Sequence, residues 1–194
     1  MENQSESQLK RYNQLYLAVI LRYKDYIEEK ENLNVAELPR LITPTDESVI
    51  SVANRIKGIF PAYSFRENYT EAVKFAQDYV NVEITNASLP IEFWLAPADT
   101  IKSGAGDVFD RANLLCSILI SLGAVTAKVV TVVNSSGRRF LVYSESDQGI
   151  IAIDLEGGKR IFKDREQFLA SLGLSEGDDV TAYEFNDKMY NNLA

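Results

Sequence analysis

Apolar and aromatic residues recur at steps of three and four positions near the start of the chain. Between about residues 5 and 33 they are Leu9, Tyr12, Tyr16, Val19, Ile20, Tyr23 and Ile27. This spacing places the side chains on one face of a helix, and Lys10, Arg11, Arg22 and Lys24 fall outside it. The pattern predicts a long amphipathic helix that packs against its own domain. A helix that docks a second subunit is the alternative.

Two more helices are expected before the middle of the chain. Thr45 or Asp46 is a favourable N-terminal cap for a helix that ends near Lys57. A second helical period runs from Tyr69 to Val80. The following stretch, SLPIEFWLAP at 88–97, is bounded by prolines and is expected to be irregular.

The second half combines one apolar helix with short strands. A helical pattern from about Val108 to Leu122 ends at Gly123. Strand-like runs follow at 127–133, 139–146 and 149–154, then a short helix at 164–172 and a last strand at 180–185. Turn residues separate the strands, as in an antiparallel sheet. We expect one α+β domain over residues 1–194, with 5–33 as an N-terminal helical extension.

Charge and hydropathy exclude several classes of partner. The formal net charge is −8, and the longest basic runs are pairs, so nucleic acid is not an expected partner. The polar first residues do not resemble a signal peptide. The apolar run at 15–21 is too short to cross a bilayer. We therefore expect no membrane insertion and a cytoplasmic location.

Histidine is absent, and there is one cysteine, Cys116. Histidine is the usual general base near neutral pH and the commonest ligand for zinc. Ser-His-Asp and Cys-His catalysis are therefore excluded, and neither a metal nor another cofactor is expected. Cys116 has leucine and isoleucine neighbours, which predict a core thiol.

The segment from Trp94 to Gly123 contains the sequence SGAGDVFDRANLL. It resembles the transglutaminase-like superfamily, which has a papain-like cysteine-enzyme fold and the motif Gly-Asp-Cys-x-Asp-x-Ala. The matching positions are Gly106, Asp107, Val108, Asp110 and Ala112. The resemblance implies a central helix against an antiparallel sheet, with the nucleophile at the first turn of that helix. Val108 occupies the nucleophile position and has no reactive group.

The resemblance implies two further triad positions on the following strands. Arg138 falls where the family has histidine, and Asp154 falls at the acidic position. If their strands pair as in the family, the two side chains form a salt bridge at the degenerate site. The alternative is that Arg138 points into solvent.

The resemblance favours a catalytically inactive protein that binds a protein or peptide partner. Trp94, Asp107, Phe140 and Tyr143, together with Phe93, are the candidate groove residues. GAGD also resembles the signature of ribokinase-like sugar kinases, in which Asp107 would be the catalytic base. Asp107 and Asp110 have a simpler interpretation as carboxylates in the first turn of a helix. A third possibility is an assembly protein that dimerises through its N-terminal helix.

Overall fold

The structure, a computed structural model, describes residues 2–31, 35–88, 93–135, 137–147, 149–174 and 180–193. The chain divides into two compact units. The smaller unit comprises residues 1–33 and 89–94, and the larger comprises 34–88 and 95–194. The expectation of one domain stays a prediction.

The smaller unit contains two consecutive helices, α1 (Glu2–Arg22) and α2 (Lys24–Glu31). They correspond to the single long helix that the spacing predicted. Helical hydrogen bonding passes through the junction, because the amide of Tyr23 donates to Val19 at 3.2 Å and the amide of Ile27 donates to Tyr23 at 3.0 Å. The junction is therefore a local interruption of one helical segment.

The helices of the larger unit surround one buried helix. They are the 3₁₀ helix η1 (Val35–Leu41), α3 (Glu47–Lys57), α4 (Phe65–Glu83), α5 (Pro97–Ser103), α6 (Val108–Ser121) and α7 (Arg165–Ala170). Asp46 caps α3, because its carboxylate accepts a hydrogen bond from the amide of Ser48 at 2.8 Å. Of the two predicted caps, Thr45 and Asp46, the second is therefore confirmed. α4 extends beyond the predicted period at both ends.

Six antiparallel strands form the main sheet. They are β3 (Lys128–Asn134), β4 (Gly137–Ser146), β5 (Gly149–Asp154), β6 (Gly158–Phe162), β7 (Thr181–Phe185) and β8 (Tyr190–Asn192), in the order β6-β5-β4-β3-β7-β8. The edge strands β6 and β8 were not predicted from the sequence, because they are short and mostly polar or exposed. A two-stranded parallel pair, β1 (Thr85–Asn86) and β2 (Ala105–Gly106), lies before α6.

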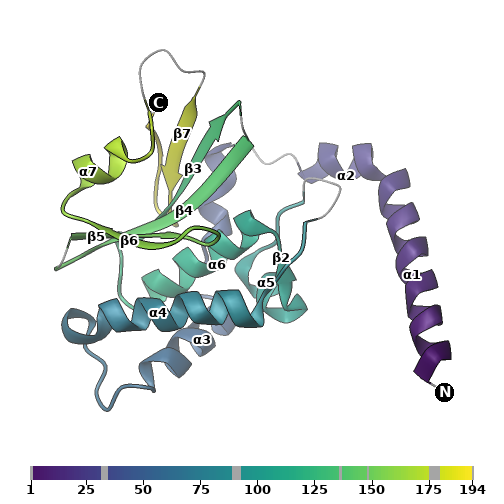
Figure 1. Cartoon of the computed structure of the whole chain (residues 1–194), viewed down its shortest axis with the longest axis horizontal. Coiled ribbons are helices and arrows are strands. Elements are labelled where there is room, and N and C mark those ends of the chain that lie inside the picture. The colour runs from purple at the N-terminus through teal and green to yellow at the C-terminus, as the bar shows by residue number, and fades with distance from the viewer. Residues whose placement is uncertain are drawn as a thin grey trace. The chain divides into compact units, whose positions relative to one another are not determined.

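Helix α6 contacts β3 and β4 of the sheet and also α3, α4 and α5 (Figure 1). All of its residues from Phe109 to Leu119 are buried. A helix that is covered on every side needs apolar residues around its whole circumference. This accounts for the run LLCSILI and confirms Cys116 as a core residue, with no exposed surface.

The two faces of the sheet bear different layers. Phe140 and Ser144 of β4 point to the helical layer, since Phe140 contacts Phe109 of α6 and Ser144 accepts a hydrogen bond from Tyr69 of α4. Leu141 and Tyr143 point to the opposite face. There they join a second core cluster that includes Phe168 of α7.

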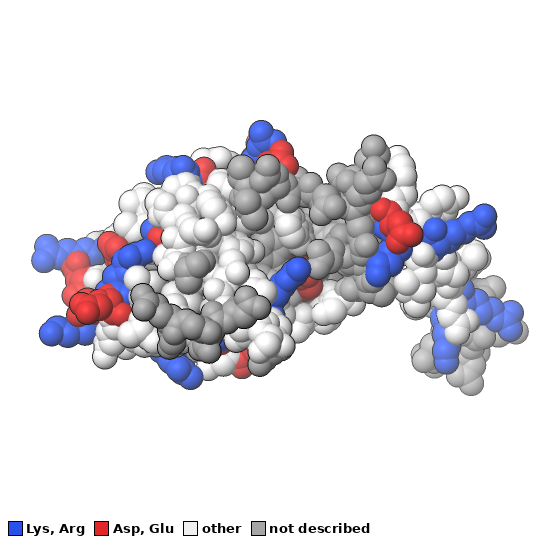
Figure 2. All heavy atoms as spheres, turned by 90° about the horizontal axis from the view of Figure 1, so that it is seen from above, with Lys and Arg blue, Asp and Glu red and all other residues white. Residues whose placement is uncertain are grey.

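On the face drawn in Figure 2, acidic and basic side chains of the described residues are interspersed. Within the described part of the chain, no helix has the length and apolar content needed to span a bilayer. The expected cytoplasmic location and the expected lack of a nucleic-acid partner stay predictions.

Candidate functional site

Two glycines bring the chain to the head of α6. Gly104 ends α5 in the left-handed region, with φ of 63°, which glycine adopts without steric cost. Gly106 then pairs with Asn86 in the short β1–β2 ladder. A Cβ atom on Gly106 would lie 2.9 Å from the Cβ of Asp110. Both glycines of the GAGD segment are thus explained by the turn and by close packing.

Asp107 and Asp110 form a reciprocal capping box at the head of α6. The Asp110 amide donates to Oδ1 of Asp107 at 2.9 Å, and the Asp107 amide donates to Oδ2 of Asp110 at 3.1 Å. The Leu95 amide donates to Oδ1 of Asp110 at 2.8 Å. These contacts confirm the predicted role of the two carboxylates in the first turn.

Asp110 is 3% exposed. The pKa of Asp110 is raised to about 6, mainly by burial and also by the nearby Asp107 carboxylate, against the lowering effect of the Leu95 amide. Its hydrogen-bond donors are neutral amides, so no positive charge offsets the loss of water.

Val108 is the first residue of α6 and is half-buried. An aliphatic side chain at this point provides neither a nucleophile nor an acid or base. Cys116 is fully buried further along α6, and burial raises the pKa of its thiol far above the ordinary value. A thiol held in its neutral form is a poor nucleophile.

Three phenylalanine rings lie between the first turn of α6 and the sheet. The ring of Phe109 is 5.2 Å from that of Phe140 on β4 and 6.1 Å from that of Phe185 on β7, between centroids. Phe109 and Phe185 are buried, and Phe140 is half-buried. The part of the sheet that contacts the head of α6 is therefore aromatic.

The ion pair between Arg138 and Asp154, one of the two alternatives for Arg138, is wrong. Asp154 pairs with Leu141 across β4 and β5, so it points to the α7 face, whereas Arg138 has the same parity as Phe140 and points to the α6 face. Arg139 takes the predicted place, and its Nε and a terminal nitrogen each lie 2.9 Å from Oδ2 of Asp154. A shift of one residue along a strand changes the face.

Asp154 also stabilises the turn that follows β5. Its Oδ1 accepts from the amides of Glu156 and Gly157 at 3.0 and 2.9 Å. Burial alone would raise the pKa of Asp154, but these amides and Arg139 outweigh burial and hold the pKa below its ordinary value. This carboxylate is therefore ionised and has a structural role.

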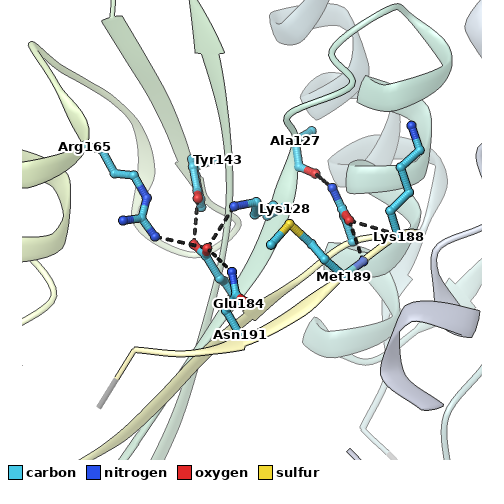
Figure 3. Close-up of polar contacts among 9 residues, drawn as sticks. Ala127, Lys128, Tyr143, Arg165, Glu184, Lys188, Met189 and Asn191 are labelled. Atoms are coloured by element: carbon cyan, nitrogen blue, oxygen red, sulfur yellow. Dashed lines mark hydrogen bonds and ion pairs between the residues drawn. The ribbon is translucent and has the colours of Figure 1, made fainter. Parts of the chain in front are cut away.

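Tyr143 is not a groove residue, because it is 1% exposed and lies on the α7 face. Its hydroxyl donates to Oε2 of Glu184 at 2.6 Å. Glu184 has no exposed surface, and Nζ of Lys128 and a terminal nitrogen of Arg165 lie 2.8 and 3.0 Å from its Oε1. We call these four residues the Glu184 cluster. Figure 3 shows the other three side chains directed at the carboxylate of Glu184.

The cluster keeps its carboxylate charged. Burial alone would raise the pKa of Glu184, but hydrogen bonds from Lys128 and Tyr143 outweigh burial and lower it. Glu184, Lys128 and Arg165 were not predicted from the sequence. A glutamate between aromatic residues in the strand TAYEF was the available signal, but its partners depend on the strand register.

The sequence matches no family profile and no curated protein. Solved structures do match. The chain is similar to calcium-bound LapG of Legionella pneumophila with a TM-score of 0.51 and 14% identity, over 83% of this chain and 88% of that one. A second LapG structure from the same organism gives a TM-score of 0.52 and 13% identity over the same shares. LapG has a transglutaminase-like, papain-like fold.

This chain has a transglutaminase-like fold. The family resemblance predicted the α+β class and the central helix against an antiparallel sheet, and both are confirmed.

In this transglutaminase-like fold, Asp107 is the N-cap and Val108 the first residue of α6, and Phe140 contacts the next residue, Phe109. Trp94 and Phe93 are half-buried residues of the smaller unit. Among the described residues, no three His, Cys, Asp or Glu side chains are grouped so that they could hold a metal ion.

Proposed function

We propose that this protein is a catalytically inactive transglutaminase-like protein that binds an extended segment of another protein at the head of α6. The observation that carries the proposal is the packing there. Val108 occupies the first position of the helix, and the facing strand contributes Phe140 to a set of tilted rings in contact with Phe109. This surface is suited to contact rather than to proton transfer.

The chemistry of the head of α6 supports an inactive protein. Acyl transfer needs an activated nucleophile and a base to take its proton. The chain has no histidine, and Arg139, which reaches the acidic position Asp154, does not release its proton at ordinary pH. Asp107 and Asp110 use their carboxylates to cap the helix. The capping role also favours a structural function of GAGD over phosphoryl transfer.

The surface at this point supports a peptide ligand. Val108, which follows Asp107 in the chain, and Phe140, which contacts the neighbouring Phe109, are half-buried, so each leaves apolar area at the surface. An extended peptide that offers one apolar side chain and one basic or amide donor matches this combination. The resemblance adds that the groove of active members accepts extended peptide.

The test is a titration of the labelled full-length protein with a pool of random ten-residue peptides, followed by NMR. We expect shift changes at Asp107, Val108 and Phe140. Val108→Arg should abolish them, because the longer charged side chain covers the apolar surface. Val125→Arg is the matched control, since Val125 is 60% exposed in the loop after α6.

Two results would contradict the proposal. One is peptide hydrolysis or amide transfer by the wild-type protein that Val108→Arg removes, which would show an enzyme. The other is a set of shift changes confined to residues away from α6, which would place the ligand elsewhere. Repeating the titration with calcium is informative because one similar structure is calcium-bound LapG.

A further inference from the structure

Helix α1 presents a row of large apolar side chains that its own unit leaves exposed. The row consists of Leu9, Tyr12, Leu15, Tyr16, Val19 and Tyr23, which we call the α1 stripe. Their exposed fractions lie between 47% and 62%. Scattered exposed apolar residues are ordinary, but a contiguous row on one helix face marks a contact surface.

The spacing of the α1 stripe favours another helix as its partner. Leu9, Tyr12, Tyr16, Val19 and Tyr23 alternate steps of three and four, which is the seam of a coiled coil. The rings of Tyr12 and Tyr16 are stacked, with centroids 6.5 Å apart, so they form one continuous surface. Helical hydrogen bonding continues as far as Tyr23 and beyond.

The size of the stripe matches what a helix dimer needs. Six large side chains that each offer on the order of 100 Å² give about 600 Å² per copy, or about 1,200 Å² in a pair, where specific interfaces begin. A second copy of the chain brings the same stripe, and a twofold pair covers both stripes at once.

We propose that a second copy of this chain covers the α1 stripe in an antiparallel helix pair. With Tyr16 opposite Val19 of the second copy, Tyr12 lies opposite Tyr23 and Arg22 lies near the uncharged Asn13. This arrangement also sets the two helix dipoles in opposite directions, which favours association over the parallel one.

The first test is the mass of the full-length protein in solution by light scattering and sedimentation. We expect twice the chain mass of 21.8 kDa at micromolar concentration. Tyr16→Glu places a charge in the centre of the seam and should weaken dimerisation at least 100-fold. Gln14→Glu, on an exposed residue outside the stripe, is the matched control and should leave the dimer intact.

The second test fixes the orientation by disulfide cross-linking. Cys116 is fully buried, so an introduced cysteine is the accessible thiol in the native protein. A mixture of Tyr16→Cys and Val19→Cys should cross-link faster than either variant alone. Cross-linking of each variant mainly to itself would overturn the antiparallel arrangement. A wild-type protein that stays monomeric at 100-micromolar concentration, on the order of 1,000 times a tight dimer's Kd, would overturn the dimer.

Discussion

Asp110 and Glu184 are two buried carboxylates with opposite shifts of pKa. Asp110 is 3% exposed and Glu184 is fully buried. Asp110 receives hydrogen bonds from amides and lies beside a second carboxylate, and its pKa rises to about 6. Glu184 forms ion pairs with Lys128 and Arg165 and accepts a hydrogen bond from Tyr143, and its pKa is lowered. Similar burial thus accompanies opposite pKa shifts, because the charge and the number of the hydrogen-bond donors determine the direction of the shift.

The two carboxylates also lie on different sides of the sheet. Asp110 is at the head of α6, where active members of the resembling family place their nucleophile. Glu184 lies on the α7 face, where the cluster joins β3, β4, β7 and α7. In this chain the densest set of ionic contacts among the described residues is therefore structural and away from the candidate site.

The largest expected effect comes from removing the charge of Glu184. Glu184→Gln leaves Lys128 without its ionic partner, although Arg165 can turn to water because its side chain is 43% exposed. Breaking a buried pair on one side costs roughly 3–5 kcal/mol, and we expect about 3. Urea unfolding of the variant measures the loss.

Glu166→Gln is the matched control for this variant, since Glu166 is exposed on α7. The wild-type contribution of Glu184 should be present at neutral pH and be lost as the pH falls through its lowered pKa, below the ordinary value of 4.5. A loss under about 1 kcal/mol in Glu184→Gln would show that the cluster does not act as a buried ion pair.

Asp110→Asn should change the pH dependence of stability. The folded state holds the Asp110 proton more tightly than the unfolded state, whose pKa is near 3.8. The free energy of unfolding therefore falls as the pH rises from about 4 to about 6, by on the order of 2–3 kcal/mol. The asparagine variant should lack this decrease while its amide oxygen still accepts from Leu95.

Thermal unfolding of both proteins between pH 4 and pH 7 measures the difference. Asp99→Asn, on an exposed residue of α5, should retain the wild-type profile. Parallel profiles for wild type and Asp110→Asn would mean that Asp110 is as easily ionised as an exposed carboxyl, and the contrast with Glu184 would disappear.

The smallest effect is expected at Asp154, whose partner is on the surface. The Arg139 side chain is 48% exposed, so Arg139→Ala should cost at most about 1 kcal/mol. Asp154→Ala should cost more, because it also removes the acceptor for the amides of Glu156 and Gly157. Urea unfolding ranks the two variants, and the reverse order would show that the ion pair outweighs the turn.

Local patterns predicted most of the elements correctly. The helical period of Glu47–Lys57, the Asp46 cap and the β3, β4 and β5 runs depend on neighbours within a few residues. The same is true of Asp107 and Asp110, whose capping box spans one helical turn. The long helix at 5–33 was not expected to be interrupted at Tyr23, where the residues alone give no breaker.

The candidate site was predicted less well, because it depends on which face of a strand each side chain takes. A contact between Arg138 and Asp154 was one of two alternatives, but the register gives that contact to Arg139. Tyr143 was expected in a groove and instead joins a buried cluster. Successive strand residues point to opposite faces of the sheet, so an error of one position assigns a side chain to the wrong face.

The sequence by itself determined that the chain has no histidine and one cysteine, and its local patterns placed most of the helices and strands. Composition and local periodicity are properties of the chain, and no folding is needed to read them. Only the tertiary structure decided that Phe140 faces α6, that Asp154 faces away from it, and that Glu184 is held by Lys128, Tyr143 and Arg165. The side-chain contacts among these join residues 19 to 56 positions apart, and strand register rather than local preference brings them together.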